Sequence, residues 1–366
     1  MSTAFIIQVI LQDKVLEDIN AEVKSFRYRE SLYGTAIYSL HIVSPDFKKY
    51  ESLVTAGENI DLRLRWFYEG DDKRKVYDNW KIVKVGKVKF RYSPTSLEVI
   101  VHGTDSGIVL SKACHNNVFY EKRISEMIAI FAKQNRLKHS VKQTLNTHTL
   151  YQCDMTDGQF IKDILQPLAV DVNGNGGYNF FIENGDTLVF EPPSLVLSKE
   201  LDSFSLYKDI QSLDVEYNDF AEAYDGTNSL ELRGFDTAQK VPVHYIANDN
   251  AVIFKKLAPY APTPPKLPSR IRLTTLPPVG KISNSMVKEE ATAIWSLNAR
   301  SLFRTQLELP STIGIKIGET AMVEAKTPSG EIFFPHGAWL IYSILQYRNE
   351  VGKSSTILYL ERRTWN

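Results

Sequence analysis

Apolar and charged residues alternate along several short segments in the first third of the chain. In 60–66 every second residue is apolar and the residues between them are charged. A period of two is typical of a strand that buries one face. The same reasoning predicts strands at 80–85, 88–92 and 97–101, with 93–96 as the turn between the last two. Several short strands in succession favour a small barrel or sandwich.

The pattern then changes to the period of an amphipathic helix. Residues 122–137 place their apolar side chains on one helix face. A second helix is predicted to begin at Thr156, which can form a capping box with Gln159, and Pro167 is expected to end or kink it. A further helix is predicted at 285–303.

A hairpin and a proline-rich segment separate these helices. The strands predicted at 178–183 and 186–190 flank Asn184 and Gly185, the dipeptide that best tolerates the positive φ angles of a type I′ turn. Prolines cluster between 257 and 278, which predicts an extended, semi-rigid connector rather than a core element.

The two ends of the chain resemble each other. In each, a Gly-Glu pair precedes a strand and a tryptophan, which follows the glycine by 23 residues in the first unit and by 21 in the second. A final strand begins 17 and 18 residues after the tryptophan. Two similarly spaced β units indicate an internal repeat. The residues that carry this signature are Gly57, Glu58 and Trp80 in the first unit, and Gly318, Glu319 and Trp339 in the second.

Together these patterns predict an α+β fold that is mainly antiparallel β, with two small similar β-barrel domains joined by a mixed helix and hairpin region. Three chains that each carry two similar units would present six similar faces, which suits a contact between a three-fold and a six-fold partner. The expected domains are a first barrel at 1–110, a helix and hairpin domain at 111–215, a connector with the proline-rich segment and a helix at 216–300, and a second barrel at 301–366.

Composition narrows the functional classes. The 366 residues include 43 Lys plus Arg and 43 Asp plus Glu, and this balance argues against a dedicated nucleic-acid binder. No apolar run approaches the roughly 20 residues needed to span a bilayer. Two cysteines, Cys114 and Cys153, cannot staple a chain of this length, which favours folding in a reducing cytoplasm.

Three groups of residues carry a catalytic or metal hypothesis, and a structural interpretation is preferred for each. Thr104–Gly107 with His102 superficially resembles the nucleophile segment of chymotrypsin-like proteases, but no framework for a triad accompanies it. His115 and His148 with the two cysteines lack the close ligand spacing of structural zinc sites. Adjacent acids such as Asp71–Asp72 and Glu289–Glu290 are expected on differing faces or in solvated loops, rather than as the carboxylate pair of a glycosidase. We therefore predict no catalytic, cofactor-binding or metal-binding residue.

A group of four lysines recurs along neighbouring strands of the first β unit. They either face water or serve as an interface or channel lining in a ring. These residues are Lys81, Lys84, Lys87 and Lys89.

The order of parts along the chain resembles the baseplate hub proteins of contractile phage tails, and the hub part of type VI secretion spike proteins. The resemblance covers most of 30–215 and 300–366. The matching segments are Gly-Thr-Asp at 103–105, Tyr-Gln at 151–152, Asp-Gly-Gln-Phe-Ile at 157–161 and the hairpin at 178–191.

The resemblance implies a non-enzymatic structural hub without cofactors. In that family three copies form a ring with pseudo-six-fold symmetry, which adapts the hexameric tail tube to a trimeric central spike and provides a conduit for DNA ejection. The implied partners are further copies of the chain and the tail tube, central spike, baseplate wedge and tape measure proteins. DNA would pass without specific binding, and no membrane insertion is implied.

The implied location is the tail baseplate of the virion, after assembly in the cytoplasm of the bacterial host. Because the chain ends soon after its second β unit, the spike and any lysozyme activity are expected on separate proteins. Two alternatives stay open: a cell-wall-degrading tail enzyme, and another ring or adsorption protein of the tail tip.

Overall fold

The computed structural model describes residues 5–11, 14–15, 19–32, 34–50, 53, 61–67, 80–174, 176–192, 202–217, 229–236, 238–248, 271–275, 283–299, 303–310, 314–333 and 335–362. None of the helices in these ranges is both long and apolar enough to cross a membrane.

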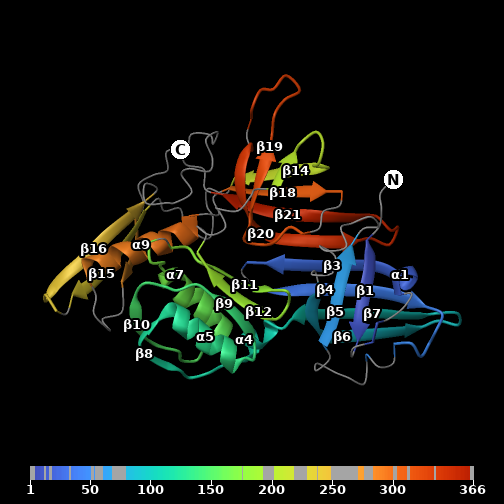
Figure 1. The fold of residues 1–366 in the computed structure, drawn as a ribbon, viewed down its shortest axis with the longest axis horizontal. Coiled ribbons are helices and arrows are strands. Elements are labelled where there is room, and N and C mark those ends of the chain that lie inside the picture. The colour runs from blue at the N-terminus through green and yellow to red at the C-terminus, as the bar shows by residue number, and fades with distance from the viewer. Residues whose placement is uncertain are drawn as a thin grey trace.

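Thirteen of the described strands form one large sheet, in which the N-terminal and C-terminal parts of the chain lie side by side (Figure 1). The strands of its N-terminal half are β1 (Ile6–Leu11), β2 (Lys14–Val15), β3 (Val23–Ser31), β4 (Gly34–Ser44), β5 (Asp61–Phe67), β6 (Lys81–Tyr92) and β7 (Leu97–Asp105). Those of its C-terminal half are β13 (Asp202–Ser205), β14 (Ser212–Tyr217), β18 (Phe303–Leu309), β19 (Thr320–Glu324), β20 (Gly337–Arg348) and β21 (Ser354–Arg362).

The two halves have the same strand order. In the first, β4 pairs with β7, β7 with β6 and β6 with β5; in the second, β18 pairs with β21, β21 with β20 and β20 with β19. All six pairings are antiparallel. The flanking strands correspond as well, since β3 pairs with β4 as β14 pairs with β18. The two ends of the sequence therefore build the same strand arrangement twice.

The prediction of a mainly antiparallel fold is confirmed, but the two closed barrels are not. Among the described strands, no pairing closes either half on itself. Instead β20 pairs with β3, so both halves belong to one open sheet with the order β14-β18-β21-β20-β3-β4-β7-β6-β5-β1-β2, and β19 and β13 branch from β20. This is possible because β20, at 12 residues, is long enough to pair with β19 near its start and with β3 near its end.

A smaller mixed region packs beside the sheet. Its elements are α4 (Ile108–Lys112), β8 (Val118–Arg123), α5 (Ile124–Gln134), β9 (Lys138–Val141), β10 (Thr147–Tyr151), α6 (Asp157–Gln159), the π-helical segment η2 (Phe160–Leu165), α7 (Gln166–Leu168), β11 (Asn179–Glu183) and β12 (Thr187–Glu191). Outside it lie α1 (Ile19–Glu22), β15 (Ser229–Asp236), β16 (Val241–Asn248), β17 (Ile271–Thr275) and α9 (Asn284–Ala299).

The predicted helices are confirmed. Buried residues of α5 lie on one face, and Thr156 forms the expected capping box with Gln159. The second helical run ends at Leu168, directly after Pro167, because proline cannot continue the backbone hydrogen-bond pattern. The last helix ends at Ala299, before the expected residue 303.

Two expectations for the strands need correction. The segments 80–85 and 88–92 form the single strand β6, in which a bulge at Gly86 shifts the register against β7. Within the expected proline-rich connector, residues 271–275 form β17, which pairs in parallel with β15. Their Ile-Arg-Leu alternation is strand-like. The prolines of the segment lie outside the described residues.

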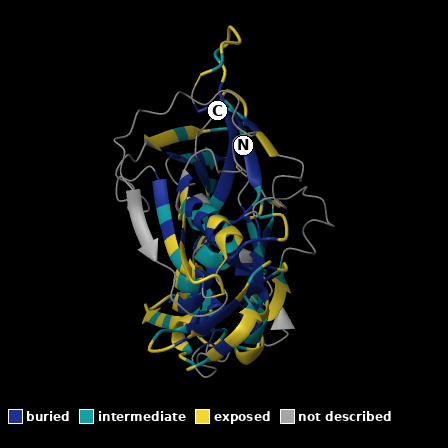
Figure 2. Ribbon diagram, turned by 90° about the vertical axis from the view of Figure 1, so that its left-hand side faces the viewer, coloured by how far each residue is buried: buried dark blue, intermediate teal, exposed yellow. Residues whose placement is uncertain are grey.

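Buried hydrophobic residues of the described ranges form three clusters. Figure 2 marks the buried positions along the ribbon in dark blue. One fills the N-terminal half of the sheet around Phe26, Leu40 and Trp66. A second joins α5 to η2 and to the β11–β12 hairpin. The third packs the C-terminal half of the sheet against α9 and the β15–β16 pair, with Trp295 and Trp339 among its members.

Candidate functional site

The joint between the two halves of the sheet is the first candidate for function. Side chains reinforce its backbone pairing: the Ser343 hydroxyl donates to the carbonyl oxygen of Glu30 at 2.6 Å and accepts from Nε of Arg29 at 3.3 Å. The indole N–H of Trp66 donates to the side-chain oxygen of Gln346. These residues come from opposite ends of the chain, so the joint holds the two repeated units in a fixed relation.

The strands β2 and β13 each have one partner among the described strands, so each leaves one edge unpaired. Two edges of the repeated strand arrangement itself are also without a partner among the described strands. One is the outer edge of β14, the last strand of the C-terminal half. The other is part of β6: residues 81–84 pair with β5, but residues 87–92 have a partner only on the β7 side. The corresponding edge of β20 is the one that pairs with β3. Unpaired edges present free N–H and C=O groups, which another strand can bind.

These two edges carry opposite charges. In β6 the exposed side chains are Lys87, Lys89 and Arg91, while Val88 and Phe90 pack against the core. In β14 the exposed acids Asp214 and Glu216 alternate with Leu213, which packs against the C-terminal core. The basic and the acidic side chains therefore both lie on the face of the sheet that turns away from the cores.

The structure separates the four predicted lysines. The bulge at Gly86 places Lys84, Lys87 and Lys89 on the outer face, whereas Lys81 lies on the core face beside Val83. Lys81 is buried, and its ammonium group lies 2.6 Å from Oε1 of Glu30, which makes it part of the interior rather than of a water-facing row. The three-residue spacing of 81 and 84 was the signal, because residues three apart in a strand face opposite ways. An interface role for Lys87 and Lys89 stays a prediction.

The two tryptophans of the repeat signature sit in related surroundings. Trp339 is buried, donates to the carbonyl of Pro335 at 2.9 Å and lies beneath the guanidinium of Arg362 at 4.1 Å. Trp80 is half-buried and lies beneath Arg65 at 4.3 Å. Each ring thus contacts an arginine of its own half of the sheet.

The Gly-Glu pairs differ in what the structure shows of them. Gly318 is buried with a φ of +80°, a conformation that favours glycine, and the carbonyl of Glu319 accepts from the N–H of Ile341. Gly57 and Glu58 lie outside the described residues.

Asp105 is the last residue of β7, where the chain leaves the first half of the sheet. Its carboxylate accepts hydrogen bonds from the backbone N–H groups of Ala36 and Gly107, both at 2.8 Å. Burial raises the pKa of Asp105 to about 7 despite these bonds. The residue therefore ties β7 to β4, which fits the structural interpretation of 104–107. His102 is exposed and belongs to the opposite face of β7.

The β11–β12 hairpin docks on this exit through its turn. Asn184 and Gly185 have φ angles of +53° and +85°, as expected for a type I′ turn. The N–H of Ile82 donates to the carbonyl of Asn184 at 3.0 Å, and that of Ser106 donates to the carbonyl of Gly185 at 2.8 Å. The turn therefore anchors the mixed region to the first half of the sheet.

The residues of the zinc hypothesis do not share ligand contacts. Cys114 and Cys153 are exposed, and the Cys114 thiol donates to the carbonyl of Met155. His115 contacts the carboxylate of the buried Asp157 at 2.8 Å. Among the described residues, no group of three or more potential ligands comes together.

His148 instead faces Glu290, a buried pair that sequence reasoning missed. Nε2 of His148 and Oε1 of Glu290 are 3.5 Å apart, and neither atom has a hydrogen bond within the described part of the chain. Burial raises the pKa of Glu290 to about 8 and lowers that of His148 to about 4. The two adjacent acids differ in burial, as expected for side chains on differing faces: Glu289 is half-buried, whereas Glu290 lies between Val287 and Ile294 on the packed face of α9. The burial of Glu290 itself was not predicted, although its helical spacing to Val287 and Ile294 was the available signal. The neighbouring pair Asp71–Asp72 lies outside the described residues.

Similarity to known proteins appears at the level of the fold. No family model matches the sequence, and no curated protein matches it. Among solved structures, a tail protein from Neisseria meningitidis has a TM-score of 0.66 at 10% identity, over 98% of this chain and 97% of that one. A 43 kDa tail protein of a Shewanella oneidensis prophage has a TM-score of 0.66 at 11% identity, over 98% and 99%.

A third similar structure is a component of the type VI secretion system of Escherichia coli, described as similar to the phage T4 tail proteins gp27 and gp5. Its TM-score is 0.59 at 10% identity, over 97% of this chain and 77% of that one. The chain therefore has the fold of phage tail and type VI secretion proteins, as its order of motifs predicted.

Proposed function

We propose that this chain is a structural component of a phage tail, in which three copies form a ring with pseudo-six-fold symmetry. The observation that carries the proposal is the doubled strand arrangement, with one joint inside the chain and, at the equivalent positions on β14 and β6, two unpaired edges of complementary charge. Within one chain, β3 of the first half pairs with β20 of the second. The equivalent pairing between chains would join β14 of one copy to β6 of the next.

Such a contact is heterologous, because two different edges meet, and it generates a ring when the rotation closes. If the joint between copies repeats the joint within the chain, three copies contribute six units at similar angles. Acidic side chains on β14 would then lie beside basic side chains on β6 of the neighbouring copy. This adds charge complementarity to the backbone hydrogen bonds that strand addition supplies.

A ring of this kind would adapt a hexameric tail tube to a trimeric central spike, and its centre would form the conduit for DNA. Baseplate wedge and tape measure proteins would be further partners, in the virion tail. The fold shared with tail proteins supports this placement, and the absence of net charge suits a passage that must not retain DNA. The role is mechanical and needs no catalytic group.

Native mass spectrometry over a range of concentrations, with electron microscopy of the assembled fraction, tests the ring. We expect a trimer with a central opening. Reversing one edge, by Asp214→Lys with Glu216→Lys, or the other, by Lys87→Glu with Lys89→Glu, should weaken the trimer. The chain that carries all four changes should recover it, since the two edges are again complementary.

Lys133→Glu with Lys142→Glu is the matched control, because both lysines are exposed and lie far from either edge in the sequence. This pair should leave the trimer intact. A wild-type chain that stays monomeric, also with tube and spike proteins present, would contradict the ring itself. A trimer insensitive to both edge reversals would contradict the pairing of β14 with β6.

A further inference from the structure

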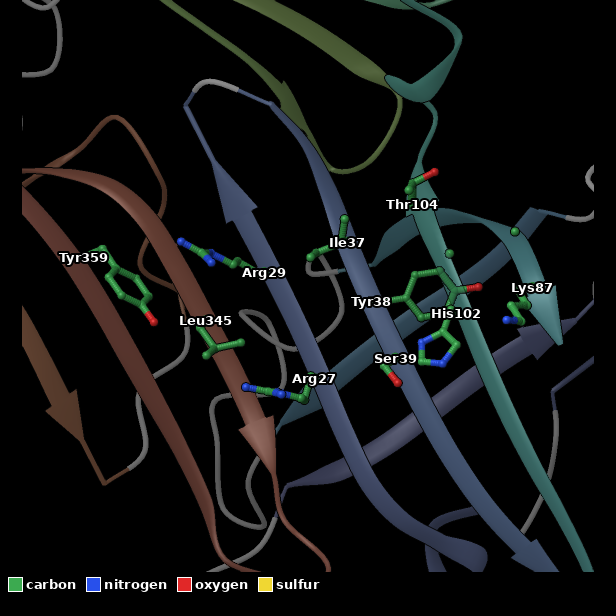
Figure 3. A pocket seen from close by; sticks show the side chains of 12 residues that line it. Arg27, Arg29, Ile37, Tyr38, Ser39, Lys87, His102, Thr104, Leu345 and Tyr359 are labelled. Carbon is green, nitrogen blue, oxygen red and sulfur yellow. The ribbon is translucent and has the colours of Figure 1, made fainter. Parts of the chain in front are cut away.

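A cavity of about 650 Å³ lies on the outer face of the sheet, across the joint between the two halves (Figure 3). Its lining comes from six neighbouring strands, β21, β20, β3, β4, β7 and β6. Most of its lining side chains alternate along the strands with core residues such as Phe26, Leu40 and Val101, so they lie on the face opposite the N-terminal cluster. Tyr38 is the exception, because it lines the cavity and also belongs to that cluster.

The lining is rich in positive charge. Arg27 and Arg29 stand two residues apart on β3 and therefore point to the same face, where both are exposed. Lys87 and His102 line the same cavity from β6 and β7. Its lining residues include no aspartate or glutamate. Within the described part of the chain, no carboxylate forms an ion pair with Arg27, Arg29 or Lys87.

The nearest acid on this face of β7 is already engaged. Glu98 lies four residues before His102, and its two carboxylate oxygens contact His41 at 2.9 Å and Arg91 at 3.0 Å. The acids on the core face, Glu30 among them, are turned away from the cavity. The positive charge of this cavity, which we call the groove, is therefore not balanced by a neighbouring carboxylate of the described chain.

A buried hydroxyl also lines this cavity. Tyr38 is 3% exposed, and its hydroxyl has no hydrogen-bond partner among the described residues. In Figure 3 its ring extends from β4 in the direction of Lys87. Gly86 and Gly103 line the cavity beside it, and the Tyr38 ring fills the space that a side chain at Gly103 would need. A buried hydroxyl without a partner costs free energy, which a bound acceptor would recover.

Part of the aromatic surface of this cavity is already covered. The guanidinium of Arg29 lies 4.9 Å from the centre of the Tyr359 ring and covers one of its faces. Nucleic-acid grooves combine positive charge with open aromatic faces on which bases stack. The lining also offers an aliphatic surface: Ile37 on β4 is 55% exposed, and Leu345 lies on β20, on the other side of β3. This combination favours a polypeptide over a nucleic acid.

We propose that the groove binds an acidic segment of a partner protein, in which carboxylate side chains alternate with apolar ones. The carboxylates would pair with Arg27 and Arg29, whose guanidinium groups suit bidentate contacts. One acceptor oxygen would take the hydrogen bond of the Tyr38 hydroxyl. The apolar side chains would pack on Ile37 and Leu345. All these residues belong to one chain, so the site does not depend on the ring.

Fluorescence anisotropy with a labelled peptide of alternating Glu and Leu tests the site, and a labelled oligothymidylate of similar length is the competing probe. We expect the peptide to bind and the Arg27→Ala variant to bind it about tenfold more weakly, as removal of a charge-assisted contact predicts. Lys133→Ala, which removes an exposed charge from α5, is the control and should leave binding unchanged.

Tyr38→Phe distinguishes binding from folding. Because the hydroxyl is buried without a partner, its removal should weaken peptide binding severalfold without lowering Tm. Absence of peptide binding, or equal losses in Arg27→Ala and Lys133→Ala, would overturn the proposal. Tighter binding of the oligothymidylate would assign the groove to nucleic acid instead. Each of these results leaves the oligomeric state, and with it the ring, to be judged separately.

Discussion

Gly185 offers the sharpest test of how the mixed region is attached to the sheet. An ideal Cβ at this position would lie 1.8 Å from the carbonyl oxygen of Ile82, far inside van der Waals contact. Gly185→Ala must therefore push the hairpin turn away from β6. Two hydrogen bonds span this contact, from Ile82 to Asn184 and from Ser106 to Gly185, and both should break.

The expected cost follows from these two effects. A non-glycine residue at positive φ costs about 1–2 kcal/mol. Each backbone group left buried without a partner adds about 1–3 kcal/mol. Counting only the two N–H donors, of Ile82 and Ser106, as left without a partner, Gly185→Ala should lower the free energy of unfolding by about 3–8 kcal/mol.

Gly352 provides the matched control. It also lies in a hairpin loop, with a φ of +83°, but a Cβ there would meet nothing within 4 Å. Gly352→Ala should therefore cost only the backbone term of about 1–2 kcal/mol. Urea unfolding followed by tryptophan fluorescence gives both values, and hydrogen exchange should show lost protection at Ile82 and Ser106 in the Gly185 variant alone. Equal costs with unchanged exchange would refute docking through this turn.

Three further variants probe buried polar groups. The folded pKa of Asp105, about 7 against an ordinary 3.8, means that the folded protein holds a proton that the unfolded chain has lost between these values. Wild-type stability should therefore fall as pH rises from about 4 to 7, and urea midpoints of Asp105→Asn should lack this component of the slope. The pKa of Glu290 is about 8 in the folded protein against an ordinary 4.5, so this residue also lowers stability as pH rises between these values. Glu290→Gln should therefore be more stable than the wild type above pH 8. A less stable variant there would contradict the cost of the buried charge. Trp66→Phe removes the hydrogen bond to Gln346 and should cost about 1–3 kcal/mol in thermal unfolding, whereas an unchanged Tm would show that the bond contributes nothing to the joint.

Local patterns predicted the elements well because local physics decides them. Three features depend only on residues a few positions apart. They are the alternation of apolar and charged residues that ends at Trp66, the single apolar face of α5 and the capping box at Thr156. The Asn184–Gly185 turn was equally predictable from the sequence, because few dipeptides tolerate two positive φ angles. The repeat was found from spacing alone, and the structure shows the same strand order in both halves.

The sequence did not show that Lys81 faces away from the other three lysines, because the bulge at Gly86 cannot be seen in it. Without that bulge, strand periodicity would place Lys81 on the same face as Lys87 and Lys89. Strand periodicity places Lys81 opposite Lys84, but only the extra residue at Gly86 aligns Lys84 with Lys87 and Lys89. The charge of Lys81 is also accommodated by a partner distant in sequence, Glu30. A buried lysine is unfavourable unless such a partner is present, and the sequence does not show which residue that is.

By itself the sequence determined many of the strands and helices, and that the chain repeats one β unit, because hydrophobic periodicity and spacing are properties of neighbouring residues. Only the tertiary structure decided that β3 pairs with β20, so that two expected barrels become one open sheet. It also decided which edges remain unpaired and that Arg27, Tyr38 and His102 line one cavity. Strand pairing between distant segments depends on which edges meet in space, and no local pattern encodes that choice.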